Sequence, residues 1–247
     1  MALLNESTLI CTLGGQPQIV TFALDILLRR GEAVREVVAL HLALSDERVG
    51  RAVKRLRAEF KDNQYRGWPC RVGHRTVWQG EYALDKIQTD AAAEATRQIV
   101  HELITELKKT GRTLHLCISG GPRIMGLMAL STALLHCRHQ DKVWHVYTRP
   151  EFQREADEGA MMHDETGENT RLIQVPMVPW GAYIPALHAL QQTPAALMSA
   201  QIAWLDETER RRCQAVWRAL TPRRKEVLHL LANGHTPQQV AQALTIT

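Results

Sequence analysis

The sequence predicts an α/β protein with a parallel sheet of about six strands, helices on both faces of the sheet, and a small all-α C-terminal region. Short and almost continuously apolar runs alternate with segments whose apolar residues recur every three or four positions. This alternation is typical of parallel strands that helices cover on both faces. After residue 178 the strand-like runs stop and prolines punctuate the chain, which indicates a separate helical region.

Each predicted element has its own signal in the sequence. The apolar runs predict strands at residues 8–12, 36–42, 71–77, 113–118, 142–147 and 171–178. Apolar residues at helical spacing predict helices from Pro17 to Gly31, from a cap at Ser45 to Phe60, from Thr89 to Lys109 and from Arg123 to His136. Proline opens a helix readily, serine and threonine cap its first turn, and glycine ends it.

The proline-rich stretch after residue 178 predicts the domain boundary. We place it near Pro185, which gives a first domain of residues 1–185 and a C-terminal region of residues 186–247. One helix is predicted from about Pro194 to Trp217. A second helix is predicted to start at Thr221-Pro222.

Composition and charge are those of an ordinary globular protein. The chain has 30 basic and 26 acidic residues, a net charge of +4, with 45% hydrophobic residues. Residues 186–247 hold seven Lys and Arg against four Asp and Glu, so the tail carries +3 and residues 1–185 carry +1. This mild basicity suits a phosphate-bearing partner without requiring one.

Five widely spaced cysteines with no CxxC pair argue against a disulfide framework and against a thiolate zinc site. They favour a reducing compartment. The N-terminal segment lacks a basic region, and no apolar stretch is long enough to span a membrane. We therefore expect a cytoplasmic protein with no membrane partner, no metal and no cofactor.

The first candidate binding loop is Gly14-Gly15-Gln16-Pro17, directly after the first predicted strand. Glycines let backbone N–H groups approach a ligand, and the following helix N-terminus favours an anion. The motif also fits a tight strand-to-helix turn without any ligand. Taken alone, it favours that plainer interpretation.

The second candidate loop, Ser119-Gly120-Gly121-Pro122-Arg123, repeats the pattern and adds a hydroxyl and a guanidinium. Arg123 at the start of a helix opposes the positive end of the helix dipole. A phosphate ligand in front of it would offset that repulsion, whereas the alternative is a surface arginine held by a carboxylate. Ligands of such sheets bind beyond the carboxyl ends of the strands, so both loops would face one pocket if their strands are neighbours.

Other groups of residues give weaker evidence for a metal site or a catalytic site. His136, Cys137, His139 and His145 are spaced like metal ligands, but a solvated helix end explains them better. The acidic run over residues 157–168 is most simply a solvated loop. No GxSxG elbow, P-loop lysine or complete GxGxxG occurs, which argues against a triad hydrolase and against nucleoside triphosphate or dinucleotide binding.

Four stretches together resemble a known family. They are LGGQPQIVTFAL (13–24), LDKIQTD (84–90), CISGGPRIMG (117–126) and WHVYTRPEF (144–152). In order and spacing they are similar to the CRISPR-associated Rossmann-like (CARF) proteins of the CRISPR ring nuclease group. The resemblance implies a Rossmann-like fold and a homodimer. It also implies a two-fold pocket for cyclic oligoadenylate, with cyclic tetra-adenylate as the expected ring.

The resemblance also assigns the pocket residues. Those implied to bind the ligand are Leu13, Gly14, Gly15, Gln16, Pro17, Gln18, Ser119, Gly120, Gly121, Pro122, Arg123 and Met125. Asp85 and Thr89 belong to a third segment and are expected to be structural. In three places the chain departs from the family pattern: Arg123 stands for a lysine, Phe22 for an acid, and Gln16 for a small or hydroxylated residue. Binding should survive these changes more easily than catalysis.

Two functions from different classes follow from the resemblance. In the first, the protein is a metal-independent ring nuclease. The ribose 2′-OH attacks the adjacent phosphate, Arg123 stabilises the developing charge, and Ser119 or Gln16 orients the hydroxyl. In the second, the same pocket only senses the ring, and the C-terminal helices pass the signal to DNA. A dimerisation scaffold without either activity is a weaker third interpretation.

The second function depends on the tail. LTPRRKEVLHLLANGHTPQQVAQALTIT (220–247) resembles the start of a LuxR-type helix-turn-helix. The recognition helix of that motif would begin after Thr247. We therefore expect this chain to bind DNA only weakly, through charge, and with a steep dependence on salt.

Overall fold

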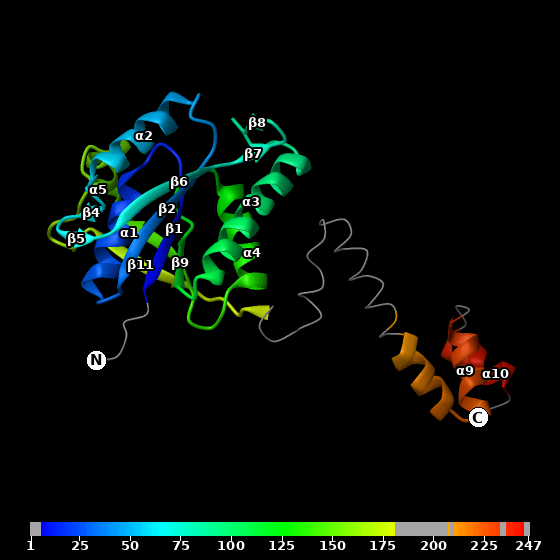
Figure 1. Ribbon diagram of the computed structural model, residues 1–247. Coiled ribbons are helices and arrows are strands. Elements are labelled where there is room, and N and C mark those ends of the chain that lie inside the picture. Colours follow the sequence, from blue (N-terminus) through cyan, green and yellow to red (C-terminus); the bar gives the residue numbers. More distant parts are fainter. Residues whose placement is uncertain (1–5, 181–206, 208–209, 233–235, 245–247) are drawn as a thin grey trace. The chain divides into compact units, whose positions relative to one another are not determined.

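The computed structural model describes residues 6–180, 207, 210–232 and 236–244. Contacts between Cα atoms divide the chain into two compact units, Met1–Ala189 and Leu190–Thr247. Figure 1 shows both units with the secondary-structure labels used below. The boundary that the sequence predicts near residue 185 lies outside the described residues.

A six-stranded sheet forms the centre of the first unit, in the order β11-β10-β9-β1-β2-β6. Each of its strands corresponds to one of the predicted apolar runs, so the predicted α/β fold is confirmed. The strands are β1 (Ser7–Leu13), β2 (Val34–His41), β6 (Arg71–Thr76), β9 (Thr113–Cys117), β10 (Lys142–Thr148) and β11 (Thr170–Val175).

Five of these strands are parallel, but β11 is antiparallel to β10, with Thr148 opposite Thr170 and Val143 opposite Val175. The expectation of a wholly parallel sheet is therefore wrong at this edge. After β10 the chain forms only α5 (Pro150–Glu155), the short 3₁₀ helix η1 (Asp157–Gly159) and a loop. A parallel pair needs a crossover along the length of the sheet. This connection instead returns at the same end, so β11 runs back alongside β10.

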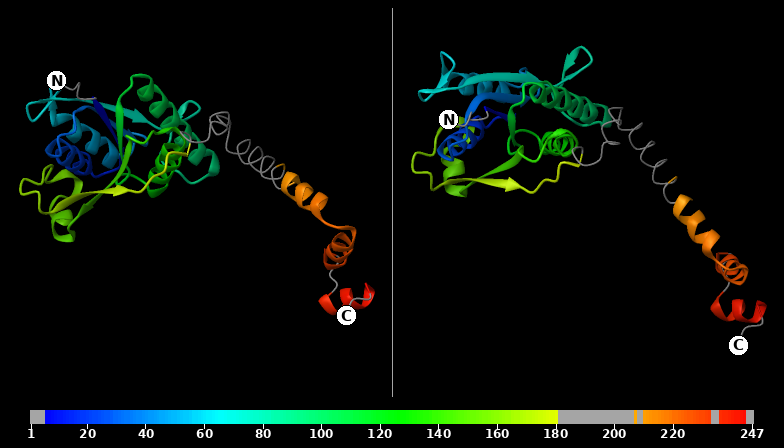
Figure 2. Two further views of the ribbon diagram at one scale, coloured as in Figure 1. Left: turned by 90° about the horizontal axis from the view of Figure 1, so that it is seen from below. Right: turned by 60° about the horizontal axis from the view of Figure 1, so that its bottom comes forward.

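Helices cover both faces of the sheet, as Figures 1 and 2 show. They are α1 (Gln18–Arg29), α2 (Glu47–Ala58), α3 (Asp90–Lys109) and α4 (Arg123–His136). Thr89 caps α3 as predicted, because its hydroxyl accepts a hydrogen bond from the Ala92 N–H. The predicted cap at Ser45 is wrong. Asp46 caps α2, and the Ser45 hydroxyl donates to Asp85 Oδ1 at 2.8 Å.

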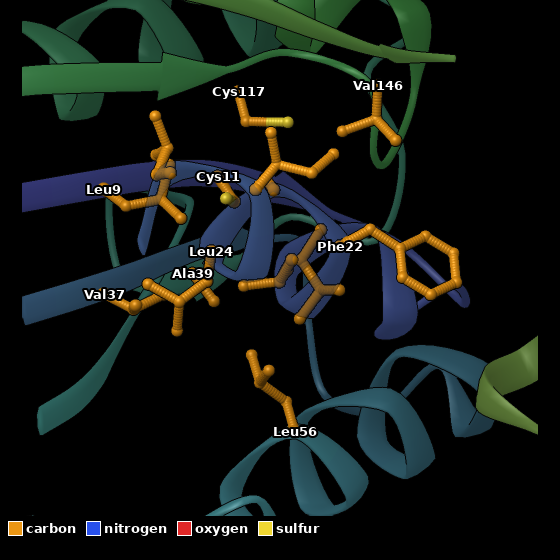
Figure 3. Packing of buried hydrophobic residues seen from close by; sticks show 14 of the residues in the cluster. Leu9, Cys11, Phe22, Leu24, Val37, Ala39, Leu56, Cys117 and Val146 are labelled. Carbon is orange, nitrogen blue, oxygen red and sulfur yellow. The ribbon is translucent and has the colours of Figure 1, made fainter. Parts of the chain in front are cut away.

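Each face of the sheet has its own apolar core. The first core joins the sheet to α1, α2 and α5, and the second joins it to α3 and α4. Figure 3 shows side chains of the first core, among them Leu9, Cys11, Leu24, Val37, Ala39, Leu56 and Cys117. The inner strands β1, β2 and β9 are largely buried on both faces and read as almost continuous apolar runs, whereas β11 at the edge alternates buried and exposed residues.

Two small sheets were not predicted. One contains β3 (Phe60–Lys61), β4 (Gln64–Tyr65) and β5 (Trp68–Pro69), and the other contains β7 (Trp78–Gln79) and β8 (Tyr82–Ala83). Two-residue strands are too short to show a period-two pattern in the sequence.

Most described residues of the C-terminal unit are helical. Residues 210–219 are helical, α9 spans Pro222–Ala232 and α10 spans Pro237–Ala243. Most of the predicted helix from Pro194 to Trp217 lies outside the described residues. A capping box formed by Thr236 and Gln239 starts α10. None of the described helices is long and apolar enough to cross a membrane.

Candidate functional site

The candidate site lies where the order of the strands reverses. The chain runs from β1 through α1 to β2 on one side of β1, and β9 later joins on its other side. Cys11 of β1 is paired with Cys117 of β9. The loops that follow these two strands are therefore neighbours at the carboxyl edge of the sheet. Open α/β sheets bind their ligands at such a switch point.

The two glycine loops touch through their backbones. A β-carbon on Gly14 would lie 2.9 Å from the Gly121 Cα, and one on Gly120 would overlap the Thr12 carbonyl oxygen. Gly121 also has a φ of +70°, which favours glycine. The glycines at these positions are thus needed for the loops to meet, whether or not a ligand is bound.

A cavity of about 430 Å³ opens beside this junction, between α1, β10 and α5. Apolar side chains and neutral polar side chains share its walls. The cavity is lined by Gln16, Gln18, Ile19, Phe22, Ser119, His145, Val146, Tyr147, Thr148, Pro150, Gln153 and Ala156. Phe22, at a position where the resembled family has an acid, is buried and packs on Phe152 with ring centroids 5.7 Å apart.

Ser119 connects the second glycine loop to β10. Its Oγ accepts a hydrogen bond from the Val146 N–H at 2.6 Å and lies 3.0 Å from His145 Nδ1. The His145 side chain is on an exposed position of β10. The hydroxyl is thus held between a backbone donor and an imidazole, at the wall of the cavity.

The side-chain amides of Gln16 and Gln18 are joined by a hydrogen bond, and the carboxylate of Asp157 determines which way the Gln16 amide is turned. The Asp157 carboxylate accepts from Gln16 Nε2 at 2.6 Å, so Gln16 Oε1 faces the other way and accepts from the Glu158 N–H at 3.0 Å. Gln18 Nε2 donates to the same Gln16 oxygen. This leaves the buried Gln18 Oε1 without a hydrogen-bond partner among the described residues.

Arg123 is the first residue of α4, directly after the second glycine loop, and it is exposed. No carboxylate stands in the first turn of the helix, and the guanidinium forms no ion pair with any described residue. The plainer interpretation, a surface arginine held by a carboxylate, therefore lacks its carboxylate. Arg123 is not among the residues that line the cavity.

The remaining predicted ligand residues have structural positions. The side chains of Leu13 and Met125 are buried in the core, so only their backbones could meet a ligand. Pro17 and Pro122 precede α1 and α4 at the N-cap position. Of the residues that the resemblance implies, Gln16, Gln18 and Ser119 line the cavity.

Sequence reasoning missed Arg48. Its Nε lies 3.2 Å from the position of a β-carbon on Gly15, and it donates to Glu158 Oε1 at 2.9 Å. Arg51 binds the other oxygen of the same carboxylate at 3.3 Å. Arg48 is thirty-three positions after Gly15 in the sequence, and no motif connects the two. Only the placement of α2 beside the first glycine loop brings them together.

The acidic run over residues 157–168 is not merely solvated, because several of its side chains bond to residues of α1, of α2 and of the first glycine loop. His163 lies 2.9 Å from both Asp25 and Glu59, and its hydrogen bond to Asp25 is the main reason why its pKa is raised. The Asp164 carboxylate accepts from the N–H groups of Asn169 and Thr170. These contacts hold the segment that carries Asp157 and Glu158 against α1 and α2.

The residues whose spacing resembles that of metal ligands have different partners in the structure. His136 pairs with His101 on α3 at 2.9 Å, Cys137 is buried, and His145 contacts Ser119. Among the described residues, no group of three or more His, Cys, Asp or Glu side chains is arranged to hold a metal.

Fold and site together define an α/β protein with a cavity of mixed apolar and polar lining beside the switch point of a mostly parallel sheet. The chain belongs to the family of CRISPR-associated protein NE0113 (Cas_NE0113), whose model matches residues 16–208. This match covers most of the chain. It includes the second glycine loop and begins inside the first, at Gln16. No curated protein matches the chain.

Several solved structures are similar to parts of the chain. Protein VC1899 from Vibrio cholerae shares 15% identity over 57% of this chain and 30% of its own, with a TM-score of 0.38. Can2 from Sulfobacillus thermosulfidooxidans, in complex with cyclic tetra-adenylate, shares 17% identity over 56% of this chain and 31% of its own, with a TM-score of 0.36. Csm6 from Enterococcus italicus, bound to cyclic hexa-2′-fluoro-hexa-dAMP, shares 12% identity over 72% of this chain and 44% of its own, with a TM-score of 0.48. The chain thus spans less than half the length of each.

Proposed function

We propose that this CRISPR-associated protein binds a cyclic oligoadenylate, and specifically cyclic tetra-adenylate, at the junction of the two glycine loops. The observation that carries the proposal is the backbone contact between Gly14 and Gly121, two residues before Arg123, whose guanidinium forms no ion pair with any described residue. Two adjacent glycine loops, the N-terminus of α4 and an exposed arginine are groups that bind phosphates. The ring itself is the ligand that the resemblance to the CARF proteins implies.

The proposed ligand requires two copies of the chain. A ring with an even number of adenosines has two-fold symmetry, which a homodimer can match. One face of β10 and β11 supports this, because Tyr147 and Ile173 there are 43% and 49% exposed. Leu127 on α4, the helix packed on the same face of the sheet, is 57% exposed. A second copy would cover these apolar side chains.

The proposed reaction is cleavage of the ring without a metal ion. The ribose 2′-oxygen attacks the adjacent phosphorus, the bond from phosphorus to O5′ breaks, and the product ends in a 2′,3′-cyclic phosphate. Arg123 and the N–H groups of the glycine loops stabilise the charge that gathers on the phosphate oxygens. Ser119 orients the 2′-OH. Gln16 is the weaker candidate for that role, because its side-chain amide already forms hydrogen bonds with Asp157 and with the Glu158 N–H.

The experiment is chromatography of cyclic tetra-adenylate after incubation with the protein, with and without EDTA. We expect linear products that end in 2′,3′-cyclic phosphate, at the same rate in both samples. An intact ring after hours, with binding retained, would show that the protein senses the ring without cutting it. A requirement for a divalent metal would overturn the mechanism.

The second candidate function is a ligand-gated transcription regulator that acts through the C-terminal helices. The observation that favours it is the helix pair α9 and α10, in which Arg223 donates to the Leu244 carbonyl oxygen. A gel-shift titration with and without cyclic tetra-adenylate tests it. Sequence-selective binding that the ring switches on or off would support regulation. Weak binding that salt abolishes would reflect only the basic tail.

A further inference from the structure

His145 is a chemically distinctive group in the wall of the cavity. Most of the lining side chains are apolar, amides or hydroxyls, and His145 is the one imidazole among them. Histidine is the side chain that most readily exchanges a proton near neutral pH. The attack of a ribose 2′-OH on phosphorus needs a group that accepts the hydroxyl proton. The arginine cannot take up that proton because it is already protonated, and the peptide groups of the glycine loops are not basic enough to do so.

The hydrogen bonds of Ser119 determine what its hydroxyl can do. A serine hydroxyl has one proton to donate and two lone pairs to accept with. The Val146 N–H, 2.6 Å away, can only donate and occupies one lone pair. His145 Nδ1, 3.0 Å away, lies at hydrogen-bond distance for the hydroxyl proton. The Ser119 side chain also forms a hydrogen bond with the buried thiol of Cys117. Because Ser119 lines the cavity, its oxygen can meet an O–H group of a ligand there.

We propose that Ser119 and His145 form a two-step proton relay for the 2′-OH of the bound ring; this inference rests on the proposed cleavage. Ser119 Oγ accepts the 2′-OH proton as it passes its own proton to His145 Nδ1. The bond from O2′ to phosphorus forms and the bond from phosphorus to O5′ breaks. The imidazolium then returns a proton to the departing O5′ through solvent. Atoms, protons and charge balance, because the step converts one phosphodiester into a cyclic phosphate and a hydroxyl.

The relay assigns separate roles to the residues of the site. Arg123 acts on the phosphate charge, Ser119 contacts the nucleophile, and His145 acts through Ser119. In the ligand-free protein, a hydroxyl that donates to Nδ1 requires the imidazole tautomer with its proton on Nε2. The relay therefore predicts which tautomer of His145 is present, and this tautomer can be measured without any substrate.

The test begins with His145→Ala, at an exposed position of β10. Single-turnover cleavage of cyclic tetra-adenylate should fall by about 10²–10⁴-fold, the usual size of a general acid–base contribution. Affinity is measured with a ring of 2′-deoxyadenosines, which lacks the nucleophile, and should change by less than about threefold. Added imidazole should restore part of the rate in His145→Ala but none in Ser119→Ala. The matched control is His139→Ala, an exposed histidine outside the cavity lining.

Nitrogen-15 NMR of the ligand-free protein gives the second measurement. The His145 ring should show the Nε2–H tautomer in the wild type, and Ser119→Ala should relax that preference. Wild-type cleavage by His145→Ala, an equal loss of rate and affinity, or the opposite tautomer would each overturn the relay while leaving ring cleavage intact. A wild-type protein that leaves the ring uncut would overturn the cleavage and the relay together.

Discussion

The Gly121 Cα lies only 2.9 Å from the position that a β-carbon on Gly14 would occupy. Two loops that are more than a hundred residues apart in the sequence therefore meet backbone to backbone. The contact forms because β1 and β9 are neighbours in the sheet. It places two sets of N–H groups and the start of α4 beside one cavity.

Gly120→Ala should disrupt this junction. A β-carbon there overlaps the Thr12 carbonyl oxygen, so the loop must move, at a cost of about 2–3 kcal/mol of unfolding free energy. Urea unfolding measures that loss, and calorimetry should show that ring binding is lost with it. Gly73→Ala in β6 is the control, because its β-carbon would meet only the Val37 carbonyl oxygen, at 3.9 Å. Equal stability and binding in the two variants would contradict the assignment.

Arg123→Ala should slow single-turnover cleavage of the ring by about 10²–10³-fold. The fall in rate should exceed the fall in affinity, because the guanidinium meets more charge in the transition state than in the ground state. Arg123→Lys should retain the rate or raise it, and EDTA should leave all these rates unchanged. Arg138→Ala, just past the other end of α4, is the control. Equal losses of rate and affinity in Arg123→Ala would make the residue a binding clamp only.

Gln18→Leu should weaken binding of the ring without lowering the stability of the fold. The variant removes a buried oxygen that has no partner among the described residues, while Gln16 keeps its bond to the Glu158 N–H. The free energy of unfolding should therefore stay the same or rise by up to about 1 kcal/mol. Affinity for the ring should fall about tenfold, because Gln18 lines the cavity and the substitution removes its polar amide from that wall. Gln98→Leu, exposed on α3, should change neither. A stable variant with full affinity would show that no ligand donor reaches Gln18.

Ile173→Glu should weaken the dimer. The charge would replace an exposed apolar side chain of β11 that a second copy is proposed to cover. Light scattering at micromolar concentration should show a dimer for the wild type and a shift to monomer for the variant. Tyr82→Glu, at a position 78% exposed on β8, should leave the mass unchanged. A monomeric wild type, with and without the ring, would refute the two-fold pocket.

His115 should make the fold sensitive to acid. Its Nδ1 accepts from Trp144 Nε1 at 3.1 Å, and burial is the main cause that lowers its pKa to about 4. Between that value and the usual value near 6.5, the unfolded chain binds a proton that the folded chain does not. Stability therefore falls as the pH falls through this window, by about 3 kcal/mol for this group.

The measurement is urea unfolding of the wild type and of His115→Gln across that range of pH. Glutamine can accept from Trp144 but cannot titrate, so the variant should lose less stability on acidification. The exposed His139→Gln is the control and should follow the wild type. Parallel curves for wild type and His115→Gln would contradict the assignment.

The sequence by itself determined the layered fold. The core strands β1, β2 and β9 are largely buried on both faces, and such strands carry their signal in local runs of apolar residues. Helix limits were equally local. Thr89 and the α4 bounds Arg123–His136 follow from caps and spacing that neighbouring residues alone define.

The tertiary structure alone decided how the site is assembled. Strand order brought Gly14 to Gly121, and the packing of α2 brought Arg48 over Gly15. Ser119 and His145 meet because β9 and β10 are adjacent. Asp157 accepts a hydrogen bond from Gln16 because the chain turns back after α5. These contacts join residues that are distant in sequence. Local periodicity and turn chemistry describe only neighbours along the chain, whereas strand pairing and core packing determine which distant side chains share a cavity.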